Sequence, residues 1–217
     1  MLLFIGIMMM LALMAALGVL ISVSKIESHQ AQQLNARPRH GSSPSLTTAK
    51  TAVVYFSRSG STAFVARHIA MRLDAALFEL SAPASRLGLP GLLRALYAAY
   101  RLKTNAGVPE YPQQTLDLTA VDTLWLGSPI WLYSPAPPIW AFVENNRFDG
   151  LHVVLFNTFN SHIADEHIAA FQAKVMLRGA ASFEHRSVLR GRMTRQLTPE
   201  QLLARVDESW FQRPTTR

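Results

Sequence analysis

The sequence opens with an uninterrupted apolar segment, which constrains the chain more than any other feature. Residues 1–24 contain no Asp, Glu, Lys or Arg. As a helix with a rise of about 1.5 Å per residue they would span roughly 36 Å, more than a hydrocarbon core of about 30 Å. A cleaved signal peptide, the alternative, has a basic N-terminal region and an apolar run of about 7–15 residues. The segment lacks both properties, so we predict that residues 1–24 form a transmembrane anchor.

Charge is distributed unevenly on the two sides of this segment. No Lys or Arg precedes it, whereas residues 25–50 contain four basic residues and one acidic residue. Basic flanks are usually retained in the cytoplasm. The sequence therefore predicts a single-pass protein of the inner (cytoplasmic) membrane that contacts lipid through the N-terminal helix and faces the cytoplasm with its main domain. Residues 25–50 are polar and contain Pro, Gly and Ser, so we interpret them as a flexible linker.

The rest of the chain alternates between short apolar runs and amphipathic segments. Apolar residues recur at helical spacing between runs that are typical of buried strands, at residues 52–56, 76–80, 123–127, 152–156 and 182–189. This alternation predicts an α/β fold, a doubly wound five-stranded parallel sheet over residues 51–210, with a tail at 211–217. The chain has no cysteine, which excludes disulfides, thiolate metal sites and cysteine nucleophiles.

Polar segments follow three of the predicted strands, at residues 57–62, 128–136 and 157–162. The carboxyl ends of parallel strands lie at one edge of a sheet, and doubly wound folds bind ligands at that edge. We therefore expect the three segments to converge.

The first polar segment is suited to an anion. It runs into a helix N-terminus, where free N–H groups favour negative charge. No lysine follows its glycine, which argues against a Walker-type nucleotide site. The alternative is a serine-rich turn that only caps the helix. The residues in question are Ser57, Ser59, Gly60, Ser61 and Thr62.

Two motifs resemble the FMN-binding loops of the flavodoxin family. Residues 55–62 read Tyr-Phe-Ser-Arg-Ser-Gly-Ser-Thr and resemble the family's phosphate loop, T/S-x-T/S-G-x-T. Residues 126–138 contain Gly-Ser-Pro-Ile-Trp followed by several prolines, and resemble the second loop, G-S/T-P-x-W. Because the two motifs occur in the family's order, the pair is more specific than either motif alone.

The resemblance implies a flavodoxin-like domain with strand order 2-1-3-4-5 that binds FMN through the three loops. The first loop would hold the phosphate. Residues expected along the ring and ribityl chain are Ser128, Pro129, Ile130, Trp131 and Tyr133. The third loop would reach the flavin edge through Asn157, Thr158, Phe159 and Asn160. It contains no glycine, unlike the third loop of many family members. The catalytic residues stay unknown.

We interpret the chain as a membrane-tethered redox protein. In this interpretation it transfers electrons to a partner protein, or reduces quinone-like acceptors with NAD(P)H as donor. The alternative is a flavodoxin-fold binding module that has lost FMN and acts by protein interaction. A basic cluster is a candidate docking surface for an acidic partner or for the NADPH phosphate: Arg178, Arg186, Arg190, Arg192 and Arg195. We predict no metal site and no nucleic-acid partner.

Overall fold

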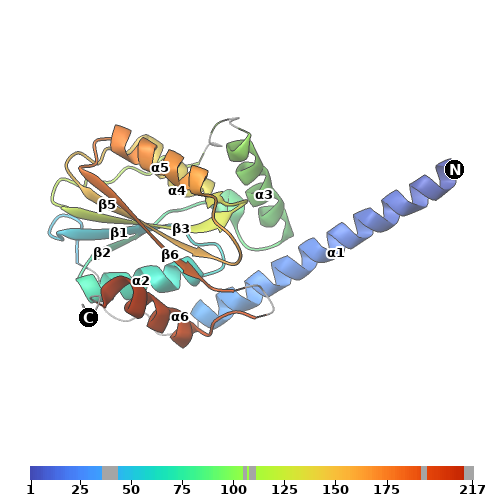
Figure 1. Cartoon of the computed structure of the whole chain (residues 1–217), viewed down its shortest axis with the longest axis horizontal. Helices are drawn as coiled ribbons and strands as arrows, with labels where there is room; N and C mark the ends of the chain where they lie inside the picture. Colours follow the sequence, from blue (N-terminus) through green and yellow to red (C-terminus); the bar gives the residue numbers. More distant parts are fainter. Residues whose placement is uncertain (36–43, 105–106, 108–110, 192–194, 213–217) are drawn as a thin grey trace.

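A central sheet with helices on both faces forms the body of the protein, and one long helix projects from it (Figure 1). The computed structural model describes residues 1–35, 44–104, 107, 111–191 and 195–212. The strands are β1 (Thr51–Tyr55), β2 (Ala76–Glu79), β3 (Thr123–Trp131), β4 (Ser134–Pro135), β5 (His152–Phe159) and β6 (Ser182–Leu189). The α-helices are α1 (Leu2–Asn35), α2 (Ser61–Leu73), α3 (Leu89–Lys103), α4 (Pro137–Asn145), α5 (Asp165–Leu177) and α6 (Pro199–Val206). Short helical turns are η1 (Pro83–Ser85) and η2 (Asp207–Phe211).

The sheet confirms the predicted doubly wound topology. Five strands pair in parallel in the order β2-β1-β3-β5-β6, which is 2-1-3-4-5 when the parallel strands alone are counted. The sequence did not predict β4, which pairs antiparallel with the end of β3. β3 also continues through residues 128–131, because it pairs with β5 as far as Pro129 and with β4 at Ile130 and Trp131.

Apolar side chains of the strands alternate between two cores, one on each face of the sheet. Val153 and Leu155 face α4 and α5, where Ile139 and Phe171 are fully buried. Val154 points to the opposite core, which α2 and α6 cover. A strand buried on both faces has apolar residues at successive positions, which explains the unbroken apolar runs in the sequence.

The N-terminal helix continues beyond the predicted anchor. α1 ends at Asn35, so residues 25–35 of the predicted linker are helical, and the prediction of a flexible linker is wrong there. Gln and Ala are good helix formers, and Ala31 and Leu34 are buried against the domain. Residues 36–43 lie outside the described part of the chain, as do residues 213–217 of the predicted tail.

α1 has the properties of a membrane-spanning helix. The helix is long and apolar enough to cross a bilayer within Leu3–Leu34, where an 18-residue window has a mean hydropathy of 2.7. Its first two-thirds project away from the domain, whereas its last turns lie against α2 and α3 (Figure 1). α1 is therefore a candidate membrane anchor that is continuous with a helix packed on the domain.

Candidate functional site

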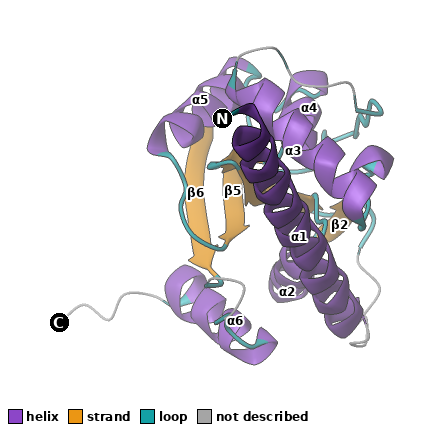
Figure 2. Ribbon diagram, turned by 90° about the vertical axis from the view of Figure 1, so that its right-hand side faces the viewer, coloured by secondary structure: helices purple, strands orange, loops and turns teal. Residues whose placement is uncertain are grey.

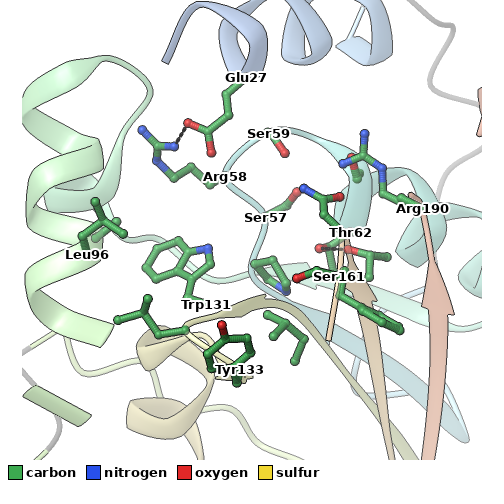
Figure 3. Close-up of a pocket in the computed structure, with 18 of the residues that line it drawn as sticks. Glu27, Ser57, Arg58, Ser59, Thr62, Leu96, Trp131, Tyr133, Ser161 and Arg190 are labelled. Atoms are coloured by element: carbon green, nitrogen blue, oxygen red, sulfur yellow. Dashed lines mark hydrogen bonds and ion pairs between the residues drawn. The ribbon is translucent and has the colours of Figure 1, made fainter. Parts of the chain in front are cut away.

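The three polar segments converge at the carboxyl edge of the sheet, as the strand order requires. They surround a cavity of about 360 Å³, within the usual range of about 300–1,000 Å³ for small-molecule sites. Figure 3 shows side chains from all three segments around this space. The predicted residues that line it are Ser57, Ser59, Ser61, Thr62, Pro129, Ile130, Trp131, Tyr133, Thr158, Phe159 and Asn160.

The first segment brings hydroxyl groups to the N-terminus of α2. Ser61 and Thr62 occupy the first two positions of this helix and are buried. The Thr62 hydroxyl lies 2.8 Å from the Thr158 hydroxyl, which joins the first segment to the third. The hydroxyls of Ser57 and Ser61 are buried and have no hydrogen-bond partner among the described residues. These two groups are the expected signature of a site that a ligand with acceptor oxygens completes.

Gly60, another predicted site residue, lies beside the cavity at the start of α2. It is the N-cap residue of α2, with a φ of 91° that favours glycine. A Cβ atom at this position would lie 3.3 Å from Leu34 Cβ. Gly60 does not line the cavity; its lack of a side chain allows α1 to approach the loop.

Arg58 connects the first segment to α1 and to the loop that precedes α3. Its side chain forms an ion pair with Glu27 of α1 and donates hydrogen bonds to the carbonyls of Ser85 and Gly88, both at 3.2 Å. The Arg58 side chain is 3% exposed, and the Glu27 side chain is 18% exposed. Glu27 therefore offsets the charge of Arg58 and fixes the end of α1 beside the cavity (Figure 3).

The second segment forms a tight hairpin between β3 and β4. Its two turn residues, Leu132 and Tyr133, have φ values of 46° and 74°, as a type I′ turn requires. Neither is glycine, and each such residue costs about 1–2 kcal/mol. The turn leaves both side chains exposed at the cavity rim. Strain of this kind at a cavity favours a functional role for the turn.

Aromatic rings border the cavity beside this hairpin. The Trp131 ring packs edge-on against Phe56, with ring centroids 5.5 Å apart. Tyr133 lies 5.7 Å from the His162 ring in an edge arrangement. Figure 3 shows the Trp131 indole between Leu96 of α3 and Ser57. The cavity thus combines a polar end at α2 with an aromatic end at the hairpin.

Ser128 and Asn157, two predicted site residues, lie beneath the cavity rather than along it. Both are fully buried. The Asn157 amide donates to the Ser128 carbonyl at 2.9 Å and accepts from His185 Nε2 at 2.9 Å. Burial lowers the pKa of His185, so the neutral imidazole is favoured. This chain of hydrogen bonds joins β6, β5 and β3 under the floor of the site.

Arg190, a member of the predicted basic cluster, also lines the cavity. It follows β6, is 9% exposed and donates a hydrogen bond to Gln196 Oε1 at 2.7 Å. Burial lowers its pKa to about 10. Its place after the last parallel strand is the signal that could have identified it, since that strand ends at the same edge as the others.

The predicted basic cluster does not form one surface in the described residues. Arg178 donates to the Glu144 carbonyl at the end of α4. Arg186 lies 5.0 Å above the Trp125 ring on the face covered by α2 and α6. Arg190 lies in the cavity, so these three members have separate surroundings. Arg195 is exposed, and Arg192 lies outside the described part of the chain.

Other lining residues come from helices that the sequence could not place. They are Glu27 of α1 and Leu92, Ala95 and Leu96 of α3. α1 precedes the first strand, and η1 separates α3 from the end of β2, so the packing of the helices brings these side chains to the cavity. No cluster of three or more potential metal ligands occurs among the residues that the structure describes.

Comparisons with known proteins agree with this architecture. A family model described as flavodoxin matches residues 50–200. A solved structure from Bacteroides uniformis shares 24% identity, covers 68% of this chain and 94% of its own, and has a TM-score of 0.54. A flavoprotein from Lactobacillus acidophilus, solved in complex with FMN, shares 23% identity, covers 64% and 93% of the two chains, and has a TM-score of 0.50. No curated protein sequence matches the chain. At these identities the structural neighbours support the fold alone.

Proposed function

The chain belongs to the flavodoxin family, and from this premise we propose that its cavity binds FMN and that the protein is a membrane-tethered flavin redox protein. The observation that carries the proposal is the pair of buried hydroxyls, Ser57 Oγ and Ser61 Oγ, without a partner among the described residues. A buried donor left unpaired costs about 1–3 kcal/mol. Two such groups beside a helix N-terminus fit a phosphate ester, which offers several acceptor oxygens.

The remaining side chains fit the two ends of FMN. Ser59 and Thr62 add hydroxyls at the phosphate end, and Arg190 supplies a buried positive charge there. Trp131 and Tyr133 provide the aromatic surface that a flat ring system needs. When bound, FMN supplies the electron chemistry, while the protein supplies its orientation and shields it from water.

The third segment supports the flavin edge without glycine. Thr158, Phe159 and Asn160 line the cavity with their side chains. The buried Asn157 holds this segment to β3 through the Ser128 carbonyl. In our proposal, side-chain hydrogen bonds from this segment replace the close backbone approach that glycine allows in other family members.

The proposed reaction is the reduction of a quinone-like acceptor, with NAD(P)H as the electron donor. α1 supports this choice, because a membrane span would hold the flavin close to lipid-soluble acceptors and raise their effective concentration. The basic residues that follow the apolar segment support placement in the inner membrane, with the domain in the cytoplasm. Transfer of electrons to a partner protein is the competing outcome.

The test uses the full-length protein purified in detergent. We expect a yellow protein whose released cofactor is FMN by mass, and apoprotein that binds FMN more tightly than riboflavin, which lacks the phosphate. Anaerobic addition of NADPH or NADH should bleach the flavin, and a quinone should restore its colour. A colourless protein that does not respond to added FMN would refute the proposal. Bleached flavin that a quinone cannot reoxidise would favour an electron carrier.

A further inference from the structure

α3 is a helix that exposes three large side chains, a leucine and two tyrosines, on the face opposite its buried side. Small residues form much of its buried face: Gly91, Ala95, Ala98 and Ala99 are buried together with Leu92. A Cβ atom on Gly91 would lie 1.8 Å from the Arg86 carbonyl oxygen, which shows how closely this end of the helix packs. The opposite face carries Leu93, Tyr97 and Tyr100, which are 48%, 64% and 59% exposed.

The exposed face of α3 combines these side chains with positive charge. Arg94 and Lys103 are exposed, and the helix contains no acidic residue. Tyrosine and basic residues of this kind are typical of helices at a membrane interface, where rings sit among headgroups and cations meet anionic lipid.

The strained hairpin continues this surface to the mouth of the cavity. Lys103 Nζ lies 5.9 Å from the centre of the Tyr133 ring. Leu132 and Tyr133 are 38% and 46% exposed, and both also line the cavity. We call Leu93, Tyr97, Tyr100, Leu132 and Tyr133 the rim surface.

α1 leaves the domain next to the rim surface. Figure 2 looks onto the face from which α1 projects, and shows α3 beside α1 on that face. The two helices are in contact. Arg58 joins them, because it pairs with Glu27 of α1 and donates to the Gly88 carbonyl just before α3. If α1 spans a bilayer, its direction therefore fixes the rim surface close to the bilayer.

We propose that the rim surface lies among the headgroups of an anionic bilayer, so that the cavity opens toward lipid. The placement of the rim surface rests on the proposed span of α1 but not on FMN, whereas the consequence for the acceptor rests also on the proposed reductase function. Its consequence is that the acceptor is a lipid-soluble molecule that enters the cavity from the membrane rather than from water.

The absence of cysteine makes a direct test available, because each introduced cysteine is the sole labelling site. Full-length protein carrying a spin label at Tyr97→Cys would be reconstituted in nanodiscs of phosphatidylcholine and phosphatidylglycerol. The control is a label at Leu177→Cys. The Leu177 side chain is 78% exposed and lies at the end of α5, away from α1. Label at Leu11→Cys reports the span of α1 independently.

The readout is the collision rate of each label with oxygen, which concentrates in lipid, and with a water-soluble nickel chelate. We expect the label at position 97 to be at least fivefold less accessible to nickel than the label at 177, and the label at 11 to favour oxygen. If the label at 11 is embedded in lipid but the labels at 97 and 177 are equally accessible to nickel, the placement of the rim surface is wrong and the span of α1 still holds. A water-exposed label at 11 would overturn the span as well. Equal shielding in purely zwitterionic nanodiscs would refute the role of anionic lipid.

A second variant tests the consequence for the acceptor. Leu93→Glu/Tyr97→Glu/Tyr100→Glu changes exposed positions that do not line the cavity. We expect reduction of a long-chain quinone in liposomes to fall at least tenfold, with reduction of a short-chain, water-soluble quinone unchanged. An equal loss with both quinones would overturn the proposed entry from lipid, and so would no loss with either.

Discussion

Replacement of Ser61 by Ala should change the stability of the apoprotein and its affinity for FMN in opposite senses. The Ser61 hydroxyl is buried, and no described residue accepts or donates a hydrogen bond to it. In the apoprotein its removal relieves an unsatisfied group, so we expect the free energy of unfolding to rise by about 1 kcal/mol. For a domain of this size that corresponds to an increase in Tm of about 2–4 °C.

The effect on ligand binding has the other sign. If Ser61 Oγ donates to the phosphate, its hydrogen bond to a charged acceptor is worth about 1.5–3 kcal/mol. The Kd of the apoprotein for FMN should therefore rise about 10- to 150-fold. The Kd for riboflavin should change little, because riboflavin presents no phosphate to this hydroxyl.

The assay pairs thermal unfolding of the apoprotein with a titration that follows quenching of flavin fluorescence. Ser134→Ala is the matched control: Ser134 is equally small and buried, but its hydroxyl accepts from Trp140 Nε1 at 3.3 Å, and it does not line the cavity. This variant should lower Tm and leave the Kd for FMN unchanged. An unaltered FMN affinity in Ser61→Ala would refute the assignment of this hydroxyl to the phosphate site.

Three further changes test the charges around the site. Arg190→Gln should weaken FMN about 10-fold or more through loss of a charged hydrogen bond and leave riboflavin binding unchanged; equal loss for both ligands in the same titration would exclude a phosphate contact. Glu27→Gln removes the carboxylate that pairs with the Arg58 guanidinium, whose side chain is 3% exposed. We expect the free energy of unfolding to fall by about 3 kcal/mol, measured as a lower Tm. The control Glu208→Gln, at an exposed position, should leave Tm unchanged. His185 has a lowered pKa in the folded state, so the unfolded state binds the proton more readily. Its contribution to stability is therefore complete above the unfolded pKa of about 6.5 and decreases as the pH falls below it. The decrease in Tm between pH 7 and pH 5 should be smaller in His185→Gln than in the wild-type protein. The same pH dependence of Tm in both proteins would contradict this reasoning.

Much of the sheet could be predicted because each strand is encoded locally. A strand that is buried on both faces needs an unbroken apolar run, and the runs at 52–56 and 152–156 are at most a few residues from β1 and β5 as observed. The convergence of Ser57, Trp131 and Thr158 then follows from parallel pairing, since it places the ends of neighbouring strands at one edge. β4 escaped prediction because a two-residue strand has no periodicity.

Contacts between distant segments escaped prediction for a different reason. No local pattern predicts the ion pair between Glu27 and Arg58, because these residues are 31 positions apart and their contact depends on where α1 packs. Packing also explains why residues 25–35, predicted as a linker, are helical. Ala31 and Leu34 are buried only because α1 packs against the folded domain.

The sequence by itself determined the elements and their order, the hydroxyl-rich loop before α2 and the apolar length of α1, because these depend on neighbouring residues and on the geometry of helices and strands. Only the tertiary structure decided that α1 packs on the loop at residues 57–62, that Arg190 is buried in the cavity and that Tyr97 of α3 is exposed on the face from which α1 projects. These features arise where surfaces far apart in the chain bury each other, and no local pattern specifies which surfaces meet.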